Sequence, residues 1–120
     1  MSPVLYLLDE NVDPIYRTEL LRRQPGLIVW KVGDPGAPPL GTLDPAILKW
    51  CEERGFLLVT NNRRSMPRHL RDHVAEGSHV PGVLVFNPND PIGGTLDDLL
   101  LIVAASDVSE YHDRVVYLPL

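Results

Sequence analysis

The stretch that decides the fold is VLYLLDEN, residues 4–11. Its first part, Val4–Leu8, is an uninterrupted apolar run, which is typical of a β-strand covered on both faces. Three polar residues, Asp9, Glu10 and Asn11, follow this run directly. Polar side chains that abut a buried strand indicate a solvated or ligand-filled cleft at the end of that strand.

Four further apolar runs repeat this pattern along the chain. The predicted strands cover Leu27–Val32, Phe56–Thr60, Val83–Phe86 and Val115–Leu118. The direction of the last strand stays open at this point.

Helix signals separate these strands, and they predict helices over residues 13–23, 44–54, 65–76 and 95–105. The Asp-Pro pairs at 13–14 and 44–45 provide an N-cap followed by a proline at the first helical position. Thr95 with Asp98 three residues later resembles a capping box. The predicted helix over residues 65–76 is polar. The connection Gly33–Thr42 holds three Pro and three Gly and is predicted to be a loop.

Strict alternation of apolar strands and helices predicts an α/β fold, a three-layer sandwich around a mostly parallel sheet. We expect the strand order 2-1-3-4, with the fifth strand uncertain, because the polar turns then converge where the strand order reverses. A length of 120 residues without repeats or linkers predicts a single domain over residues 1–120.

Composition excludes several classes of protein. A content of 44% hydrophobic and 22% charged residues is that of a globular chain. The single Cys51 excludes an internal disulfide and fits a reducing compartment, and no apolar run is long enough for a bilayer. We therefore expect a cytoplasmic protein with no membrane partner. The net charge of −5 means that any nucleic-acid role needs a local basic patch.

The carboxyl ends of parallel strands meet at one edge of a sheet, so we expect the residues after the first and third strands to lie close together. Those after the third strand are Thr60, Asn61 and Asn62, followed by Arg63 and Arg64. The alternative interpretation is that these polar residues only build turns and caps, which favour Asp and Asn.

Two of these segments carry a family resemblance. The runs Leu7-Leu8-Asp9-Glu10-Asn11 and Leu58-Val59-Thr60-Asn61-Asn62 look like the PIN-like group, the short bacterial relatives of the PIN-domain ribonucleases. The segment Pro81–Phe86 resembles that group's following strand, so the resemblance spans Val4 to about Phe86. Such proteins are often the toxin half of a toxin–antitoxin pair.

The resemblance implies a metal-dependent endoribonuclease that holds Mg²⁺ or Mn²⁺ with carboxylates. It makes Asp9 and Asp44 the expected metal ligands, Glu10 a supporting acid and Asn62 a neutral ligand or phosphate contact. It also implies RNA as substrate and a small antitoxin protein or a second copy of the chain as a possible partner.

The chain departs from the family where relatives commonly carry Thr-Arg-Asp and a further Asp two residues later. Thr60-Asn61-Asn62-Arg63-Arg64 stands there instead, which removes negative charge from the expected metal site. A competing hypothesis follows, in which the domain binds RNA or a partner protein without hydrolysis.

A phosphate clamp is the expected role of the basic residues near this segment. Arg64, Arg68 and Arg71 are spaced i, i+4, i+7, which would place them on one helical face beside Arg63. The other predicted RNA contacts are Asn11, Thr60 and Asn61. The alternative is a solvated face that pairs with Asp72 and Glu76.

The remaining residues of chemical interest have ordinary interpretations. His69 and His73 lie at i, i+4, a spacing that zinc sites use, but Leu70 stands where the metalloprotease motif needs Glu. Cys51 is expected in the core. Trp30 and Trp50 are expected to pack in the core or between helix and sheet.

Overall fold

The computed structural model describes residues 3–120, in which five strands form one all-parallel sheet. The strands are β1 (Tyr6–Leu8), β2 (Val29–Lys31), β3 (Leu57–Thr60), β4 (Val83–Val85) and β5 (Val115–Tyr117). Their order is β2-β1-β3-β4-β5. This confirms the α/β class and the predicted order 2-1-3-4, and it places β5 parallel to β4 at the edge of the sheet.

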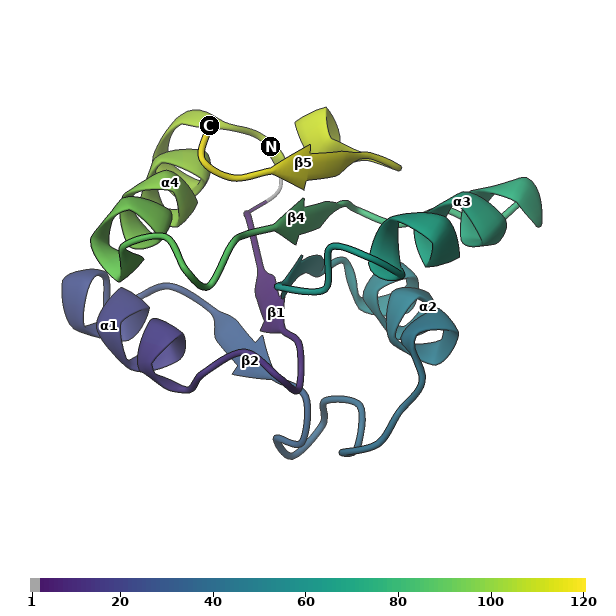
Figure 1. Cartoon of the computed structure of the whole chain (residues 1–120), viewed down its shortest axis with the longest axis horizontal. Helices are drawn as coiled ribbons and strands as arrows, with labels where there is room; N and C mark the ends of the chain where they lie inside the picture. The colour runs from purple at the N-terminus through teal and green to yellow at the C-terminus, as the bar shows by residue number, and fades with distance from the viewer. Residues whose placement is uncertain (1–2) are drawn as a thin grey trace.

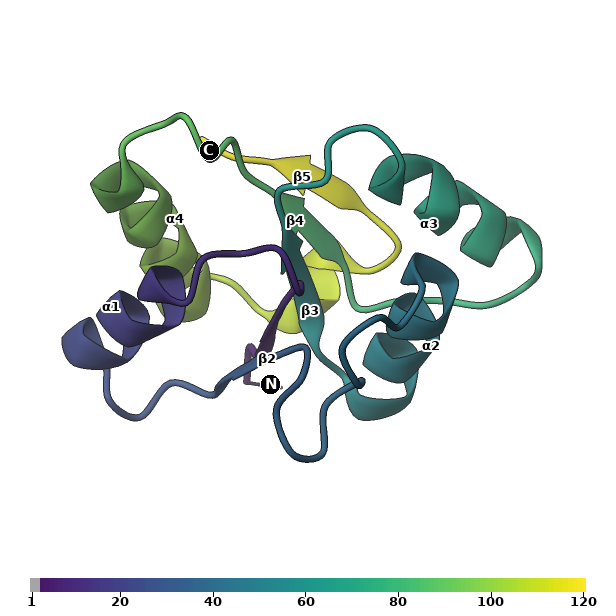
Figure 2. The same cartoon turned by 60° about the horizontal axis from the view of Figure 1, so that its bottom comes forward.

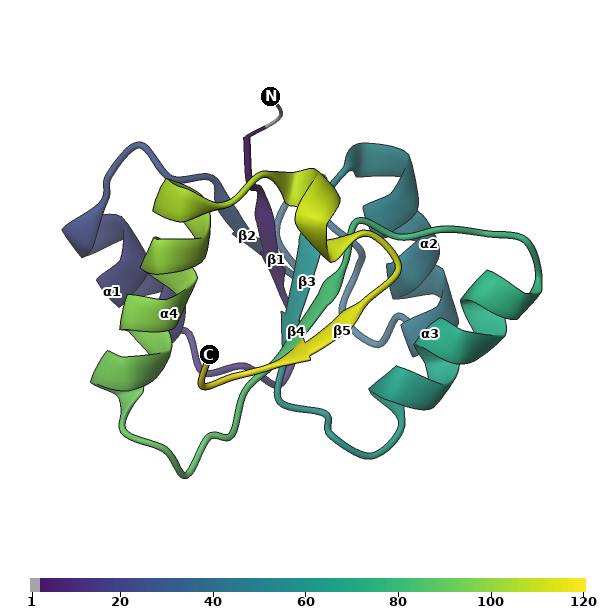
Figure 3. The ribbon, with the colours of Figure 1, turned by 90° about the horizontal axis from the view of Figure 1, so that it is seen from above.

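Helices cover both faces of the sheet. They are α1 (Ile15–Arg23), α2 (Asp44–Arg54), α3 (Met66–Ala75), α4 (Ile92–Ala105) and the short 3₁₀ helix η1 (Val108–Tyr111). Figures 1 and 3 show α1 and α4 together on one side of the sheet and α2 and α3 together on the other. The predicted three-layer sandwich is therefore confirmed. Within residues 3–120, no helix has the length and apolar character needed to cross a bilayer.

The apolar strands are explained by cores on both faces of the sheet. Leu57 and Val59 on β3 belong to the core beneath α1 and α4, whereas Leu58 belongs to the core beneath α2 and α3. Successive side chains of a strand point to opposite faces, so every residue of a doubly covered strand must be apolar.

The core beneath α2 and α3 contains the residues that were expected to pack. Cys51 is fully buried there, and Trp30 and Trp50 pack against it from its margin. The two indole rings and the ring of Phe56 form a cluster, with centroids 4.9–6.0 Å apart. These aromatic side chains therefore serve packing between helix α2 and the sheet.

The predicted start of the last helix is wrong. Helix α4 begins at Ile92 with Pro91 as its N-cap, so Thr95 is not a capping residue but a buried side chain, 4% exposed, inside the helix. The sequence predicted a later start because Gly93 and Gly94 are typical of a loop, since glycine disfavours a helix by about 1 kcal/mol per residue. Packing of Ile92 against the core outweighs that propensity.

Two other helix predictions need correction. Helix α2 has Leu43 as its N-cap, and Asp44 is its first residue, with no capping hydrogen bond from its side chain. Helix α1 starts one residue after Pro14, although the Asp13 carboxylate still accepts a hydrogen bond from the Ile15 N–H at 2.9 Å. The carboxylate of Asp44 is therefore available for contacts outside its own helix.

Helix α3, predicted as polar, is amphipathic. It buries Met66, Leu70 and His73 against the second core. It begins at Met66 after the N-cap Ser65, so Arg64 lies outside it. The predicted helical series Arg64, Arg68, Arg71 therefore begins in a turn.

Candidate functional site

The carboxyl ends of β1 and β3, the first residue of α2 and the segment before α3 bound a hollow of about 430 Å³. Its lining residues are Asp9, Glu10, Asn11, Gly41, Thr42, Asp44, Asn61 and Asn62. All of these except Gly41 and Thr42 were predicted from the sequence as site residues. Figure 2 shows the long connection from β2 to α2 beside this end of the sheet. We call this hollow the edge pocket.

Asp9 is held rigidly at the floor of the edge pocket. The residue is 7% exposed, and its Oδ2 accepts a hydrogen bond from the hydroxyl of Thr60 at 2.8 Å. Its Oδ1 accepts from the backbone N–H of Glu10 at 2.8 Å. The sequence predicted Thr60 as an RNA contact. Thr60 is instead fully buried, so its role is to position Asp9.

Asn62 has a defined orientation. Its Oδ1 accepts from the Ser65 N–H at 3.1 Å, and because a backbone N–H can only donate, that atom must be the carbonyl oxygen. The amide Nδ2 then lies 2.7 Å from Ser65 Oγ and 3.3 Å from Asp44 Oδ2. Asn62 thus presents hydrogen-bond donors to the pocket and not the carbonyl that was expected as a neutral metal ligand.

Asp44 is the second acid of the edge pocket. Burial, and after it the negative charge of Asp9, raise the pKa of the Asp44 carboxyl, while His69 acts in the opposite direction. Its Oδ2 lies 3.6 Å from Nε2 of His69. Asp9 and Asp44 come from distant parts of the chain, and the charge of Asp9 disfavours the ionised form of Asp44.

Glu10 has a structural task that the sequence did not suggest. Its Oε1 accepts from the backbone N–H of Gly41 at 2.6 Å, and its backbone carbonyl accepts from Nζ of Lys31 at 2.7 Å. The segment 33–42 forms neither helix nor strand, as predicted. The carboxylate of Glu10 thus fastens this loop to the end of β1.

The arginines do not line the edge pocket. Arg63, Arg64 and Arg68 are exposed, and Arg71 lies at a separate hollow with Asp113 near the start of β5. The expected clamp of four arginines beside Asp9 is therefore not assembled. Arg63 and Arg64 are nevertheless close to the pocket along the chain, because they directly follow Asn62, which lines it.

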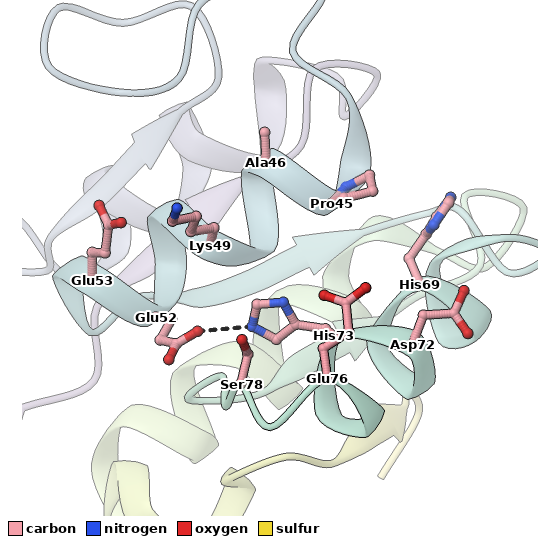
Figure 4. Close-up of a pocket in the computed structure, with 10 residues that line it drawn as sticks. All are labelled: Pro45, Ala46, Lys49, Glu52, Glu53, His69, Asp72, His73, Glu76 and Ser78. Atoms are coloured by element: carbon pink, nitrogen blue, oxygen red, sulfur yellow. Dashed lines mark hydrogen bonds and ion pairs between the residues drawn. The ribbon is translucent and has the colours of Figure 1, made fainter.

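A larger groove of about 790 Å³ runs between α2 and α3 (Figure 4). Its walls carry the carboxylates of Glu52, Glu53, Asp72 and Glu76. His73 is buried, and its Nε2 lies 2.9 Å from Glu52 Oε1 and 2.9 Å from the carbonyl of His79. His69 lines this groove and also reaches Asp44. No local pattern pointed to His69 as a neighbour of the edge pocket.

The edge pocket offers oxygen ligands for a small hard cation, but few of them. Asp9 and Asp44 fit Mg²⁺ or Mn²⁺, which commonly bind one or two carboxylates and keep several waters. Glu10 and Asn62 are oriented for other contacts. Among residues 3–120, the only three-residue group of His, Cys, Asp or Glu with closely spaced ligand atoms lies elsewhere, at His79, His112 and Asp113.

Comparisons with protein-family models, with curated proteins and with solved structures gave no match to this chain.

Proposed function

We propose that this chain is a PIN-like domain that acts on RNA at the edge pocket as a metal-dependent endoribonuclease. Asp9 and Asp44 would hold Mg²⁺ or Mn²⁺, and the substrate would lie along Asn61 and Asn62 at the margin of the pocket. The resemblance of the first and third strand ends to the PIN-like group motivates the choice of reaction.

One observation carries the proposal: Asp9 and Asp44, 35 positions apart in the sequence, meet in a single solvent-connected hollow. The raised pKa of Asp44, caused first by burial and then by Asp9, expresses the cost of keeping both charges there. A divalent cation relieves this repulsion, which is a physical reason for the acids to be placed together.

A bound cation would supply activation of water and stabilisation of the charge that develops on a phosphate. The chain's own residues prepare the site. Thr60 and the Glu10 N–H fix both oxygens of Asp9. The donors of Asn62 hold Asp44 in place, and His69 offers an imidazole 3.6 Å from the same carboxylate oxygen. Arg63 and Arg64 directly follow Asn62 in the sequence and are exposed, so they are accessible to a phosphate backbone.

The decisive experiment is an RNA cleavage assay on the full chain with Mn²⁺ and with Mg²⁺, run beside Asp9→Asn. Cleavage should require the metal, and Asp9→Asn should reduce it by a factor of about 100 or more, because a charged ligand to the cation is lost. Asp72→Asn, an exposed acid of α3, is the matched control and should leave the rate unchanged. Metal-independent cleavage, or equal rates in Asp9→Asn and wild type, would contradict the proposal.

A second candidate function is RNA binding without hydrolysis. The orientation of Asn62, which directs an amide donor at Asp44, favours it, because the pocket then lacks a third ligand for the cation. Fluorescence anisotropy with a labelled RNA separates the two functions. Saturable binding, together with no cleavage in either metal, would identify the binding module.

A further inference from the structure

We propose a second metal site, of the Zn²⁺ class, at the opposite end of the sheet, formed by His79, His112 and Asp113. The nitrogens of the two imidazoles and a carboxylate oxygen of Asp113 all lie within 4.8 Å of one another. Imidazole nitrogen and carboxylate oxygen are ligands that Zn²⁺ accepts in proteins. This proposal is independent of the function proposed for the edge pocket.

The three side chains are brought together by the topology. His79 lies on the connection into β4, and His112 and Asp113 lie on the connection into β5. Because β4 and β5 are parallel neighbours, both connections enter the sheet at its amino end, far along the strands from the edge pocket. Residues separated by 33 positions in the sequence therefore become adjacent.

One of the distances between ligand atoms in the cluster equals that of a zinc site, and a second is shorter. Asp113 Oδ2 lies 3.3 Å from His112 Nε2 and 2.7 Å from His79 Nδ1. Bonds of about 2.0–2.1 Å in tetrahedral geometry place ligand atoms about 3.3 Å apart. The first distance already matches, and rotation of the exposed His79 side chain would lengthen the second.

Asp113 is fixed by contacts that leave one oxygen for the imidazoles. Its N–H donates to the Val80 carbonyl at 2.9 Å, and its Oδ1 accepts from the Val80 N–H at 2.8 Å. Its φ of +58° is a left-handed conformation that only a few non-glycine residues adopt. A backbone held in this conformation keeps Oδ2 directed at both histidines, whose rings stack with centroids 5.3 Å apart.

Three protein ligands and an exposed surface leave a fourth position for water. Both histidine side chains are more than half exposed, at 59% and 58%. A bound ion would join the connection before β4 to the connection before β5, and so fasten the edge strand β5 to the sheet. Zinc should therefore raise the thermal unfolding temperature of the protein, because it binds the folded chain.

The test uses the untagged full chain, stripped with a chelator and titrated with Zn²⁺ by calorimetry. We expect one saturable Zn²⁺ site per chain and an upward shift of the unfolding temperature. His112→Ala and Asp113→Asn should each weaken Zn²⁺ binding by about tenfold or more. Asparagine tolerates the left-handed backbone and keeps an oxygen for the Val80 N–H, so Asp113→Asn should still fold.

Two control variants show whether the zinc is bound at this cluster. Asp72→Asn removes an exposed acid of α3, and Asp97→Asn removes an exposed acid of α4, both outside the cluster and the edge pocket. Both should bind Zn²⁺ as wild type does. Absence of saturable Zn²⁺ binding in wild type, or equal affinity in His112→Ala, would overturn the proposal.

Nuclear magnetic resonance of the wild type covers the case in which a variant does not fold. Addition of Zn²⁺ should shift the ring signals of His79 and His112 before those of other histidines. If these two rings stay unmoved while others shift, the cluster is only a hydrogen-bonded group of side chains and the proposal fails.

Discussion

The side-chain amide of Asn62 donates to the carboxylate of Asp44, with 3.3 Å between Nδ2 and Oδ2. The carbonyl of the same amide accepts from the Ser65 N–H, one residue before α3. Asn62 therefore connects the start of α3 to the first residue of α2. It occupies the place beside Asp44 where a further carboxylate would strengthen a metal site.

Replacement of Asn62 by Asp should convert this contact from attraction to repulsion. Asn62→Asp keeps the acceptor for Ser65 but places a negative charge against Asp44, which should destabilise the metal-free protein by about 1 kcal/mol. Mn²⁺ should bind more tightly to the variant, and cleavage should rise if the site is catalytic. Calorimetry and urea unfolding with and without Mn²⁺ measure both effects.

Asn61→Asp is the matched control, because Asn61 lines the same pocket and its amide donates to the Asn11 carbonyl, at 3.5 Å, instead of to Asp44. It should change Mn²⁺ affinity less than Asn62→Asp does. Lower RNA affinity in Asn62→Asp without a gain in Mn²⁺ binding would favour the binding module. If neither cleavage nor affinity responds, the edge pocket is not the functional site.

The pH dependence of stability should carry the signature of Asp44. Because burial, and then Asp9, raise its pKa, the folded protein holds this proton more tightly than the unfolded chain does. Its favourable contribution is present below the unfolded pKa of about 3.9 and is lost as pH rises through the folded value. Asp44→Asn should therefore stabilise the metal-free protein at neutral pH, by less than about 1 kcal/mol because the group is partly exposed.

Urea unfolding between about pH 3.5 and pH 7 measures this difference, which should shrink towards the acid end. Asp34→Asn is the control of opposite sign. Burial tends to raise the pKa of Asp34, but the side chain of Arg17 and the Lys31 N–H lower it overall. Asp34→Asn should be less stable than wild type at neutral pH, and this difference in the free energy of unfolding should shrink as the pH falls. If both variants changed the free energy of unfolding at neutral pH in the same direction, the pKa shift assigned to Asp44 would be wrong.

Substitutions at Glu10 separate a loop anchor from a metal ligand. Glu10→Gln keeps an oxygen that can accept from the Gly41 N–H, so the loop 33–42 should stay protected and Mn²⁺ affinity should change little. Glu10→Ala removes that acceptor and should speed amide exchange at Gly41, with little change in global stability. Hydrogen exchange with mass spectrometry measures this. A large loss of Mn²⁺ affinity in Glu10→Gln would make Glu10 a ligand after all.

Charge reversal should separate the arginines by position. Arg63→Glu lies next to the edge pocket and should weaken RNA binding and lower its salt dependence by about one phosphate contact. Arg71→Glu makes the same charge change at the separate hollow near Asp113 and should leave RNA affinity nearly unaltered. Filter binding at several salt concentrations compares the two. Equal losses would indicate a diffuse electrostatic effect instead of a local contact.

Two glycines should respond in opposite ways to alanine. Gly82, with φ +150°, has no room for a Cβ, which would lie 2.6 Å from the Tyr111 carbonyl oxygen. Gly82→Ala should cost about 1–3 kcal/mol. Gly94 lies inside α4 with nothing within 4 Å of a built Cβ, so Gly94→Ala should stabilise by about 0.5–1 kcal/mol. Denaturant unfolding measures both, and stabilisation by Gly82→Ala would contradict the close approach of Tyr111 to Gly82.

The amino-acid sequence by itself determined the layout of the fold. Apolar runs such as Val4–Leu8 and Phe56–Thr60, alternating with segments of helical pattern, were sufficient for an α/β sandwich because doubly covered strands need apolar residues on both faces. The rule that parallel strands end at one edge was sufficient to bring Asp9 and Asn62 to the same pocket. These signals are local periodicities and connection rules, which a sequence displays directly.

Only the tertiary structure decided what each polar side chain contacts. It directs Asn62 at Asp44 through its amide, fastens Glu10 to Gly41, and separates Arg71 from the pocket. It also places His112 beside His79. Hydrogen-bond partners depend on side-chain directions and on distances between elements far apart in the chain, and these are set by packing of helices on the sheet. No local pattern contains that information.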